Sequence, residues 1–104
     1  MKTYTGDRTI DGVQVLVDGA PLDPRTGEHE FSKNGFEWSY EGPEPSQLAF
    51  AMLADHLGDA KLALEYEREF MRKVVANFDN EWEMTSSDID RALAALGYRS
   101  GRAA

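Results

Sequence analysis

The segment from Leu48 to Ala54 is a run of seven apolar residues with no polar position among them. A surface helix needs a polar stripe, so a helix of this composition must be covered by protein on most sides. Pro45 suits the first position of such a helix, where its missing N–H costs nothing, and Gln47 falls where a capping-box partner would lie. We therefore predict a buried helix that ends at Gly58. The run is much too short for the roughly 20 residues that cross a bilayer.

The first part of the chain has the composition of β-strands. Residues 13–17 are compact and rich in β-branched side chains, with Asp-Gly pairs at 11–12 and 18–19. Asp-Gly favours the positive φ values of tight hairpin turns, which predicts a strand at 13–17 and a partner strand over Thr3–Arg8. Residues 20–24 contain two prolines and can form only a short edge segment.

Aromatic and polar residues alternate strictly over Phe36–Tyr40, after a polar loop at 25–33. This alternation predicts a further strand with Phe36, Trp38 and Tyr40 on one face. That face could be a stacking platform for bases, but such platforms lie beside basic grooves, and here the neighbours are acidic. Packing of the three rings against the helices is the favoured interpretation.

Two more helices are predicted after Gly58. Asp59 caps one from about Ala60 to Phe78, with an apolar stripe formed by Ala63, Tyr66, Phe70 and Val74. The other begins at a capping-box spacing, Thr85 with Asp88, and stops at Gly97. Its apolar face consists of Ile89, Ala92, Leu93 and Leu96, and a short extended segment is expected at 82–84 just before it.

These elements predict an α+β fold, a small antiparallel sheet made of a hairpin and the aromatic strand, packed against two or three α-helices. The length of 104 residues suits one domain, which we expect to cover residues 1–97, with a flexible tail at 98–104. The chain contains no Cys, which excludes disulfides and thiolate sites and fits a reducing, cytoplasmic location. No signal-peptide core is seen near Met1.

The formal net charge is −8, and it is distributed unevenly. Five acidic residues lie between Asp79 and Asp90 with no Lys or Arg among them. Such a chain repels nucleic acid and anionic membranes and attracts basic protein surfaces. The predicted partner-binding residues are Asp79, Glu81, Glu83, Asp88, Asp90, Glu65, Glu69 and Trp82. The acidic segment could instead be merely solvated, or could imitate DNA through carboxylates spaced about 5–6 Å apart along a helix.

Asp55 and His56 are the candidate pair for acid/base or metal chemistry. Adjacent helix residues point in different directions, however, and each has a structural explanation: His56 near a helix C-terminus, with Gly58 and Asp59 as caps. Residues 79–83 resemble a calcium loop only superficially, because the glycine and the terminal Glu of such loops are missing. No nucleophile or phosphate-binding glycine loop is present, and we expect no enzyme activity, metal or cofactor.

Three strings, Val17–Leu22, Gly35–Gly42 and Leu53–Asp59, together resemble a family of short uncharacterised proteins of bacteria, plasmids and phages, known only as a domain of unknown function. The resemblance implies a compact domain associated with mobile elements and carries no activity.

Three hypotheses for function follow. The first is a non-enzymatic module that docks an acidic face on a basic protein surface, as an anti-CRISPR or other anti-defence inhibitor would; mimicry of DNA is one form of this hypothesis. The second is a small regulatory or housekeeping domain that acts as a homodimer anchored by Trp38 or Trp82. The third is an enzyme that uses Asp55 and His56. A monomer and a homodimer both remain open.

Overall fold

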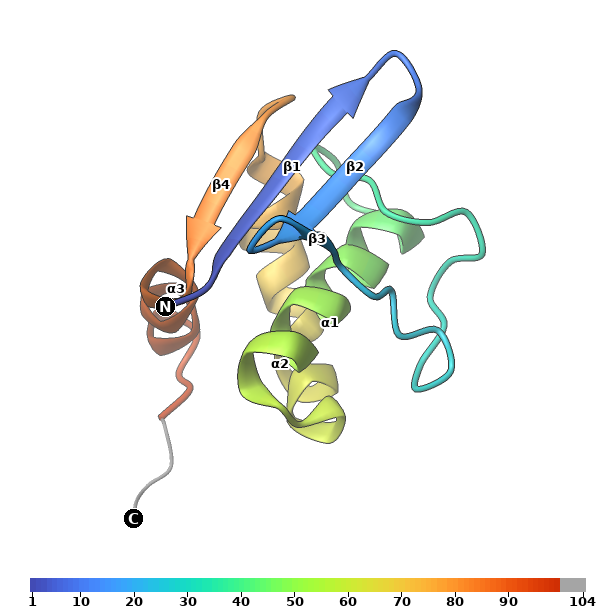
Figure 1. Cartoon of the computed structure of the whole chain (residues 1–104). Coiled ribbons are helices and arrows are strands. Elements are labelled where there is room, and N and C mark those ends of the chain that lie inside the picture. Colours follow the sequence, from blue (N-terminus) through green and yellow to red (C-terminus); the bar gives the residue numbers. More distant parts are fainter. Residues whose placement is uncertain (100–104) are drawn as a thin grey trace.

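The computed structural model describes residues 1–99 and confirms the α+β fold (Figure 1). A four-stranded antiparallel sheet, in the order β3-β2-β1-β4, is packed against three helices. The elements are β1 (Thr3–Thr9), β2 (Gly12–Val17), β3 (Ala20–Pro21), α1 (Pro43–Leu57), α2 (Ala60–Lys73), the 3-10 helix η1 (Val75–Asn77), β4 (Trp82–Thr85) and α3 (Ser86–Ala95). No helix within residues 1–99 combines the length and the apolar character needed to cross a membrane.

One of the two predicted Asp-Gly turns is confirmed. In the first hairpin Thr9 pairs with Gly12, so the turn consists of Ile10 and Asp11, and Gly12 is the first residue of β2. Val17 pairs with Ala20 across a two-residue turn in which Asp18 and Gly19 both have positive φ, 50° and 85°. Positive φ at both central positions suits the right-handed twist of the paired strands, and Asp-Gly adopts it readily. The other edge is built from a distant part of the chain, since β4 pairs with β1, for example Tyr4 opposite Met84.

α1 is buried on all sides over ten consecutive residues, from Pro45 to Ala54, as its composition predicts. Gly58 ends it with φ 68° and donates its N–H to the Ala54 carbonyl. The helix begins two residues earlier than expected, at Pro43, with Gly42 as its N-cap.

Gln47 is not a capping-box residue, which corrects the sequence interpretation. Its side chain is fully buried and binds the preceding loop instead. Its Oε1 accepts hydrogen bonds from the N–H groups of Phe31 (2.6 Å) and Ser32 (3.1 Å). Its Nε2 donates to the carbonyls of Pro24 (2.7 Å) and His29 (3.0 Å). One side-chain amide thus satisfies four backbone groups of a segment that has no regular secondary structure.

The helix predicted over 60–78 is shorter in the structure. α2 ends at Lys73, and the backbone then tightens into η1. The Val75 carbonyl accepts the Phe78 N–H (3.2 Å) at the end of η1 and also the Ser39 N–H (3.1 Å), which ties residues 36–40 to the end of the helix. The caps are as expected: Asp59 accepts from the Leu62 N–H, and Thr85 with Asp88 forms a complete capping box for α3.

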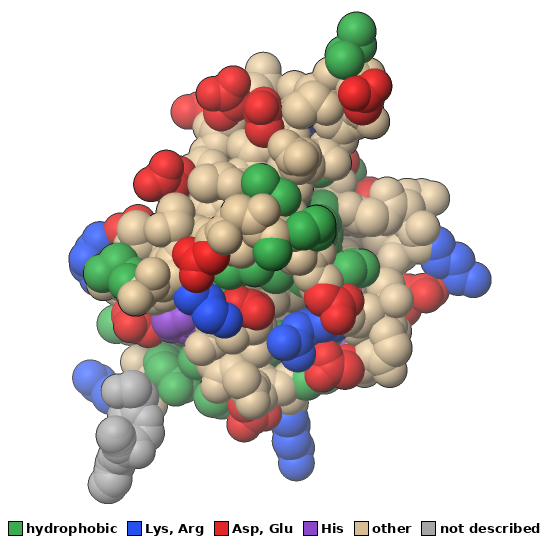
Figure 2. All heavy atoms as spheres, in the orientation of Figure 1, with side chains coloured by type: hydrophobic (Ala, Val, Ile, Leu, Met, Phe, Trp, Pro, Cys, Tyr) green, Lys and Arg blue, Asp and Glu red, His purple; other side chains and the backbone are tan. Residues whose placement is uncertain are grey.

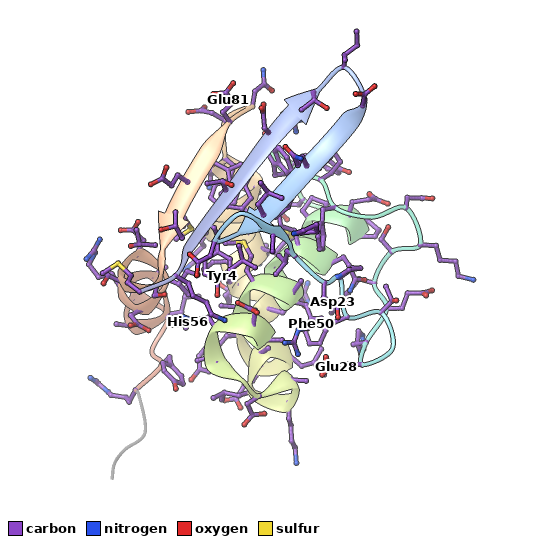
Figure 3. The ribbon with its side chains drawn as sticks, viewed as in Figure 1. Tyr4, Asp23, Glu28, Phe50, His56 and Glu81 are labelled. Atoms are coloured by element: carbon purple, nitrogen blue, oxygen red, sulfur yellow. The ribbon has the colours of Figure 1, made fainter. Side chains whose placement is uncertain are left out.

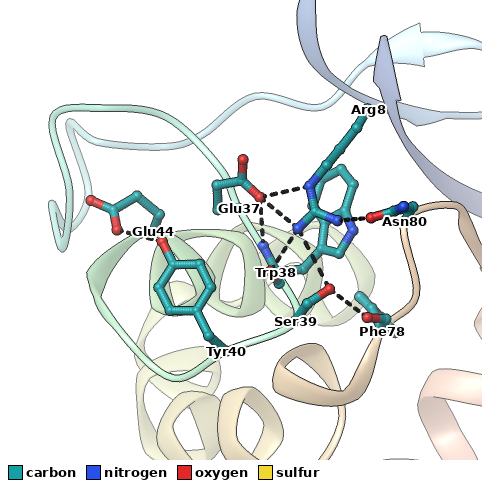
Figure 4. A network of polar contacts seen from close by, with 8 residues as sticks. All are labelled: Arg8, Glu37, Trp38, Ser39, Tyr40, Glu44, Phe78 and Asn80. Atoms are coloured by element: carbon teal, nitrogen blue, oxygen red, sulfur yellow. Dashed lines mark hydrogen bonds and ion pairs between the residues drawn. The ribbon is translucent and has the colours of Figure 1, made fainter.

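The prediction of a strand over Phe36–Tyr40 is wrong, because this segment is irregular and joins no sheet. Arg8 of β1 holds it in place (Figure 4). The guanidinium donates to Glu37 Oε1 (2.8 Å) and to the Trp38 carbonyl (2.8 Å), and lies 4.7 Å from the Trp38 ring centroid. The aromatics do not share one face, since Trp38 is fully buried and Tyr40 is 44% exposed.

Of the predicted tail 98–104, residues 100–104 lie outside the described part of the chain. Tyr98 is partly buried, and its ring meets that of Tyr66 edge-on with centroids 5.4 Å apart. The described structure therefore includes Tyr98 in its packing.

Gly6 generates the first prediction. It lies on β1 opposite Trp82, and a methyl group at this position would overlap the indole ring. We expect Gly6→Ala to lower the free energy of unfolding by about 2 kcal/mol through overpacking, measured by urea denaturation. Gly27→Ala is the matched control, because nothing lies within 4 Å of its added methyl group and its φ is not positive. A Gly6→Ala variant as stable as the control would show that this contact is not tight.

Candidate functional site

The acidic residues between 79 and 90 do not form one surface. β4 separates them: Glu81 lies at one end of the sheet, whereas Tyr4 and His56 mark the other end, near α3 (Figure 3). The predicted partner-binding set thus divides into a group around β4 and a group on α3, and the two groups have different environments.

The β4 group lines a groove on the exposed face of the sheet, which we call the acidic groove. It has a volume of about 350 Å³, and its polar lining consists of Asp7, Glu81, Glu83, Thr5 and Gln14. The strand register explains the convergence, since Thr5 pairs with Glu83 and Asp7 pairs with Gln14 on the face opposite Tyr4 and Arg8. Figure 2 shows acidic side chains gathered over this end of the molecule.

The three carboxylates of the groove are free of internal cations. Within residues 1–99, none of Asp7, Glu81 and Glu83 forms an ion pair. No Lys or Arg lines the groove. Their negative charge is therefore available to a ligand. Asp7 was missed in the sequence because its position depends on the pairing of β1 with β4, which no local pattern reveals.

The carboxylates on α3 and α2 are largely used within the fold. Asp88 accepts from the Thr85 N–H and pairs with Arg91. The Thr85 N–H is the main reason that the pKa of Asp88 lies below its usual value. Asp90 binds His56 Nε2 at 2.6 Å, and Glu69 lies 3.6 Å from both Arg72 and Lys73.

Of the remaining predicted partner-binding residues, two lie outside the groove, and Trp82 lines it with a side chain that is almost entirely buried. Asp79 and Glu65 are exposed but do not line the groove. Trp82 is only 8% exposed, with its ring stacked on Phe78 at 4.3 Å and edge-on to Trp38 at 5.8 Å. Since both indoles are buried, neither Trp38 nor Trp82 offers an exposed interface anchor.

Asp55 and His56 have separate partners, so the structure does not bring them together as a pair. Asp55 accepts hydrogen bonds from the Tyr4 hydroxyl (2.6 Å) and the Lys2 ammonium (3.1 Å), whereas His56 binds Asp90. Burial raises the pKa of Asp55, but the bonds from Tyr4 and Lys2 outweigh it and leave that pKa below the usual value. Burial, and then the bond to Asp55, raises the pKa of Tyr4. This cluster joins the N-terminal strand to α1.

No group of three or more His, Asp or Glu residues within the described chain is arranged to hold a metal ion. Within the segment 79–83, Glu81 and Glu83 line the acidic groove, whereas Asp79 lies outside it.

A second cavity, which we call the arginine cavity, lies between the start of α1 and the end of α2 and has a volume of about 590 Å³. Arg68 and Arg72 line it, together with Phe31, Met71 and Ser46. Sequence analysis did not single out Arg68, because two arginines four apart on a helix are common on solvated faces.

Glu67 is a buried carboxyl group that sequence analysis also missed. It is 6% exposed, and its Oε2 has no hydrogen-bond partner. Burial raises its pKa, against a smaller opposing effect of a hydrogen bond with Ser46. Glu67 comes four residues after Ala63 and three before Phe70, which puts it in the apolar stripe of α2. That spacing is the feature of the sequence that indicates its burial.

Glu67 should make stability pH-dependent. A carboxyl group with a raised pKa in the folded state takes up protons on folding, so stability falls as pH rises above the unfolded value of about 4.3 and levels off above the folded pKa. We expect Glu67→Gln to raise the melting temperature at pH 7 and to flatten its fall between pH 4 and 7, measured by thermal unfolding. The exposed Glu65→Gln on the same helix should change neither, and equal pH profiles for Glu67→Gln and wild type would contradict this assignment.

Comparison with known proteins identifies a family whose function is unknown. No curated protein matches the chain significantly, and no solved structure does so either. A family of unknown function, DUF6166, matches residues 4–95, which includes all of the sheet except its first residue and all three helices. The chain is therefore a member of the DUF6166 family.

Proposed function

We propose that this protein is a non-enzymatic binding module that docks the acidic groove on a basic surface of another protein. The observation that carries the proposal is the convergence of Asp7, Glu81 and Glu83 on one groove without an internal cation. Glu69, Asp88 and Asp90 have partners within the fold. The exposed Glu30, Glu65 and Asp79 form no ion pair with residues 1–99 but do not line the groove.

The groove has the chemistry for a Lys or Arg side chain. Three carboxylates surround the space, and the side chains of Thr5 and Gln14 offer further oxygen acceptors. Charge-assisted hydrogen bonds to carboxylates are about twice as strong as neutral ones. The net charge of −8 would steer a basic partner toward the protein and would increase the association rate at low salt.

The partner is a protein and not a nucleic acid, because phosphates would meet the same carboxylates. Imitation of DNA by α3 is the weaker form of the proposal, since Asp88 is neutralised by Arg91 and engaged at the helix cap, and Asp90 binds His56. A nucleic-acid-handling complex of a defence system has the required basic surface, so an anti-defence inhibitor of a mobile element is one concrete form. The homodimer hypothesis loses its anchors, because both Trp side chains are buried.

Neutralising the groove tests the proposal. We expect Glu81→Gln with Glu83→Gln to weaken binding of a hexalysine peptide by about tenfold, which corresponds to about 1.4 kcal/mol. Wild-type affinity should fall steeply with added salt, because these charges are exposed to solvent. Calorimetry at two salt concentrations gives the affinities, and NMR amide shifts should map the peptide to β1 and β4.

The matched control is Glu30→Gln with Glu65→Gln, which removes the same charge from exposed positions outside the groove. Both double variants should melt as the wild type does. The natural partner can then be captured from cell extract with wild type as bait, and the groove variant should lose it while the control keeps it. If both variants lose the partner equally, net charge and not the groove accounts for binding. Tight binding of bare duplex DNA at ordinary ionic strength would overturn the proposal.

A further inference from the structure

The arginine cavity is lined by two arginines, one glutamate (Glu41) and apolar side chains, in a protein whose net charge is −8. Its volume of about 590 Å³ lies within the range of roughly 300–1,000 Å³ that small-molecule sites occupy. It lies apart from the acidic groove and shares no lining residue with it. Whatever this cavity binds is therefore independent of the proposed docking function.

The two guanidinium groups are not equivalent. Arg72 lies 3.5 Å from Glu41 and 3.6 Å from Glu69, so two carboxylates already compete for it. Arg68 forms no ion pair with any residue between 1 and 99. Arg68 is thus the principal group that can receive an anion in this cavity.

The start of α1 contributes little to anion binding, although it borders the cavity. Pro43 and Pro45 have no N–H, and the Ser46 N–H already donates to the Gly42 carbonyl. Of the N–H groups that a helix start usually offers, only those of the N-cap Gly42 and of Glu44 remain, the latter next to its own carboxylate. The site therefore depends on the arginines and not on the helix terminus.

The rest of the lining combines apolar side chains with Glu41 and Ser46. Phe31 and Met71 line the cavity beside the first proline of α1. The Phe31 ring contacts those of His29 (4.4 Å between centroids) and Phe50 (6.1 Å). An aromatic ring and a thioether are favourable surfaces for a flat apolar group.

We propose that the arginine cavity binds a small organic anion, with its carboxylate or phosphate at Arg68 and Arg72 and a flat apolar body against Phe31 and Met71. Arginine suits this role because its planar fork can bind two oxygens of a carboxylate or phosphate at once. Glu41 competes with the ligand for Arg72, so its carboxylate lowers the affinity of the cavity for the anion.

The test uses 2-naphthoate, 2-naphthyl phosphate and the neutral 2-naphthamide as probes, titrated into the labelled protein and followed by NMR. Both anions should shift the amide signals of Phe31, Ser46 and Met71, and the amide probe should bind at least about tenfold more weakly. Comparison of the two anions then identifies the preferred head group.

Variants give changes of opposite sign. Arg68→Gln should weaken naphthoate binding by about tenfold or more, whereas Glu41→Gln should strengthen it severalfold, because it removes a competitor for Arg72. Lys61→Gln is the matched control, since it removes the same charge from an exposed position of α2 outside the cavity, and it should leave the affinity unchanged. Three results would each overturn the proposal: equal binding of naphthoate and naphthamide, weaker naphthoate binding by Glu41→Gln, or no shift of the Phe31, Ser46 and Met71 amides up to millimolar probe.

Peptide binding at the acidic groove should be unaffected by Arg68→Gln, so failure of one proposal is distinguishable from failure of the other.

Discussion

The need to cover α1 on every side governs the architecture. Ten consecutive residues of this helix are buried, so no single layer can shield it, and cover comes from several directions. α2, η1 and α3 contact it directly, the sheet supplies core residues such as Tyr4 and Val15, and the irregular loop is held over it by Gln47. Because the loop has no ladder of its own, its hydrogen bonds must come from a side chain, and a buried glutamine provides them without introducing a charge.

Carboxylates that have partners within the fold and carboxylates on the exposed face of the sheet have different roles. Carboxylates near helix ends or next to arginines serve the fold, as Asp59, Asp88 and Glu37 do. Those on the exposed sheet face have no such role within the described chain and converge on one groove. The distinction matters for function, because a carboxylate that is already paired must lose an interaction before it can bind a partner, whereas an unpaired one loses only water.

Local chemistry made much of the fold predictable, and long-range contacts account for the errors. The Asp-Gly turn at 18–19, the left-handed Gly58 and the capping box of Thr85 each depend on neighbours within a few residues. The 36–40 segment alternates like a strand but is held by Arg8, about thirty positions away, and by the end of α2. Gln47 and Glu67 are polar residues buried for reasons that only the assembled loop and helices reveal. The candidate site shows the same pattern. Glu81 and Glu83 could be proposed as binding residues from the sequence, whereas Asp7 could be placed beside them only once the strand order was known.

The position of β1 inside the sheet has a consequence for how the protein is made. Its two neighbours come from opposite parts of the chain, β2 a few residues later and β4 more than seventy residues later. During synthesis the hairpin can form early, but one side of β1 stays unpaired until residues 82–85 have left the ribosome exit tunnel. The nascent chain therefore carries an open strand edge next to the apolar α1 segment for most of its translation, which is the period in which chaperones would have the most to protect.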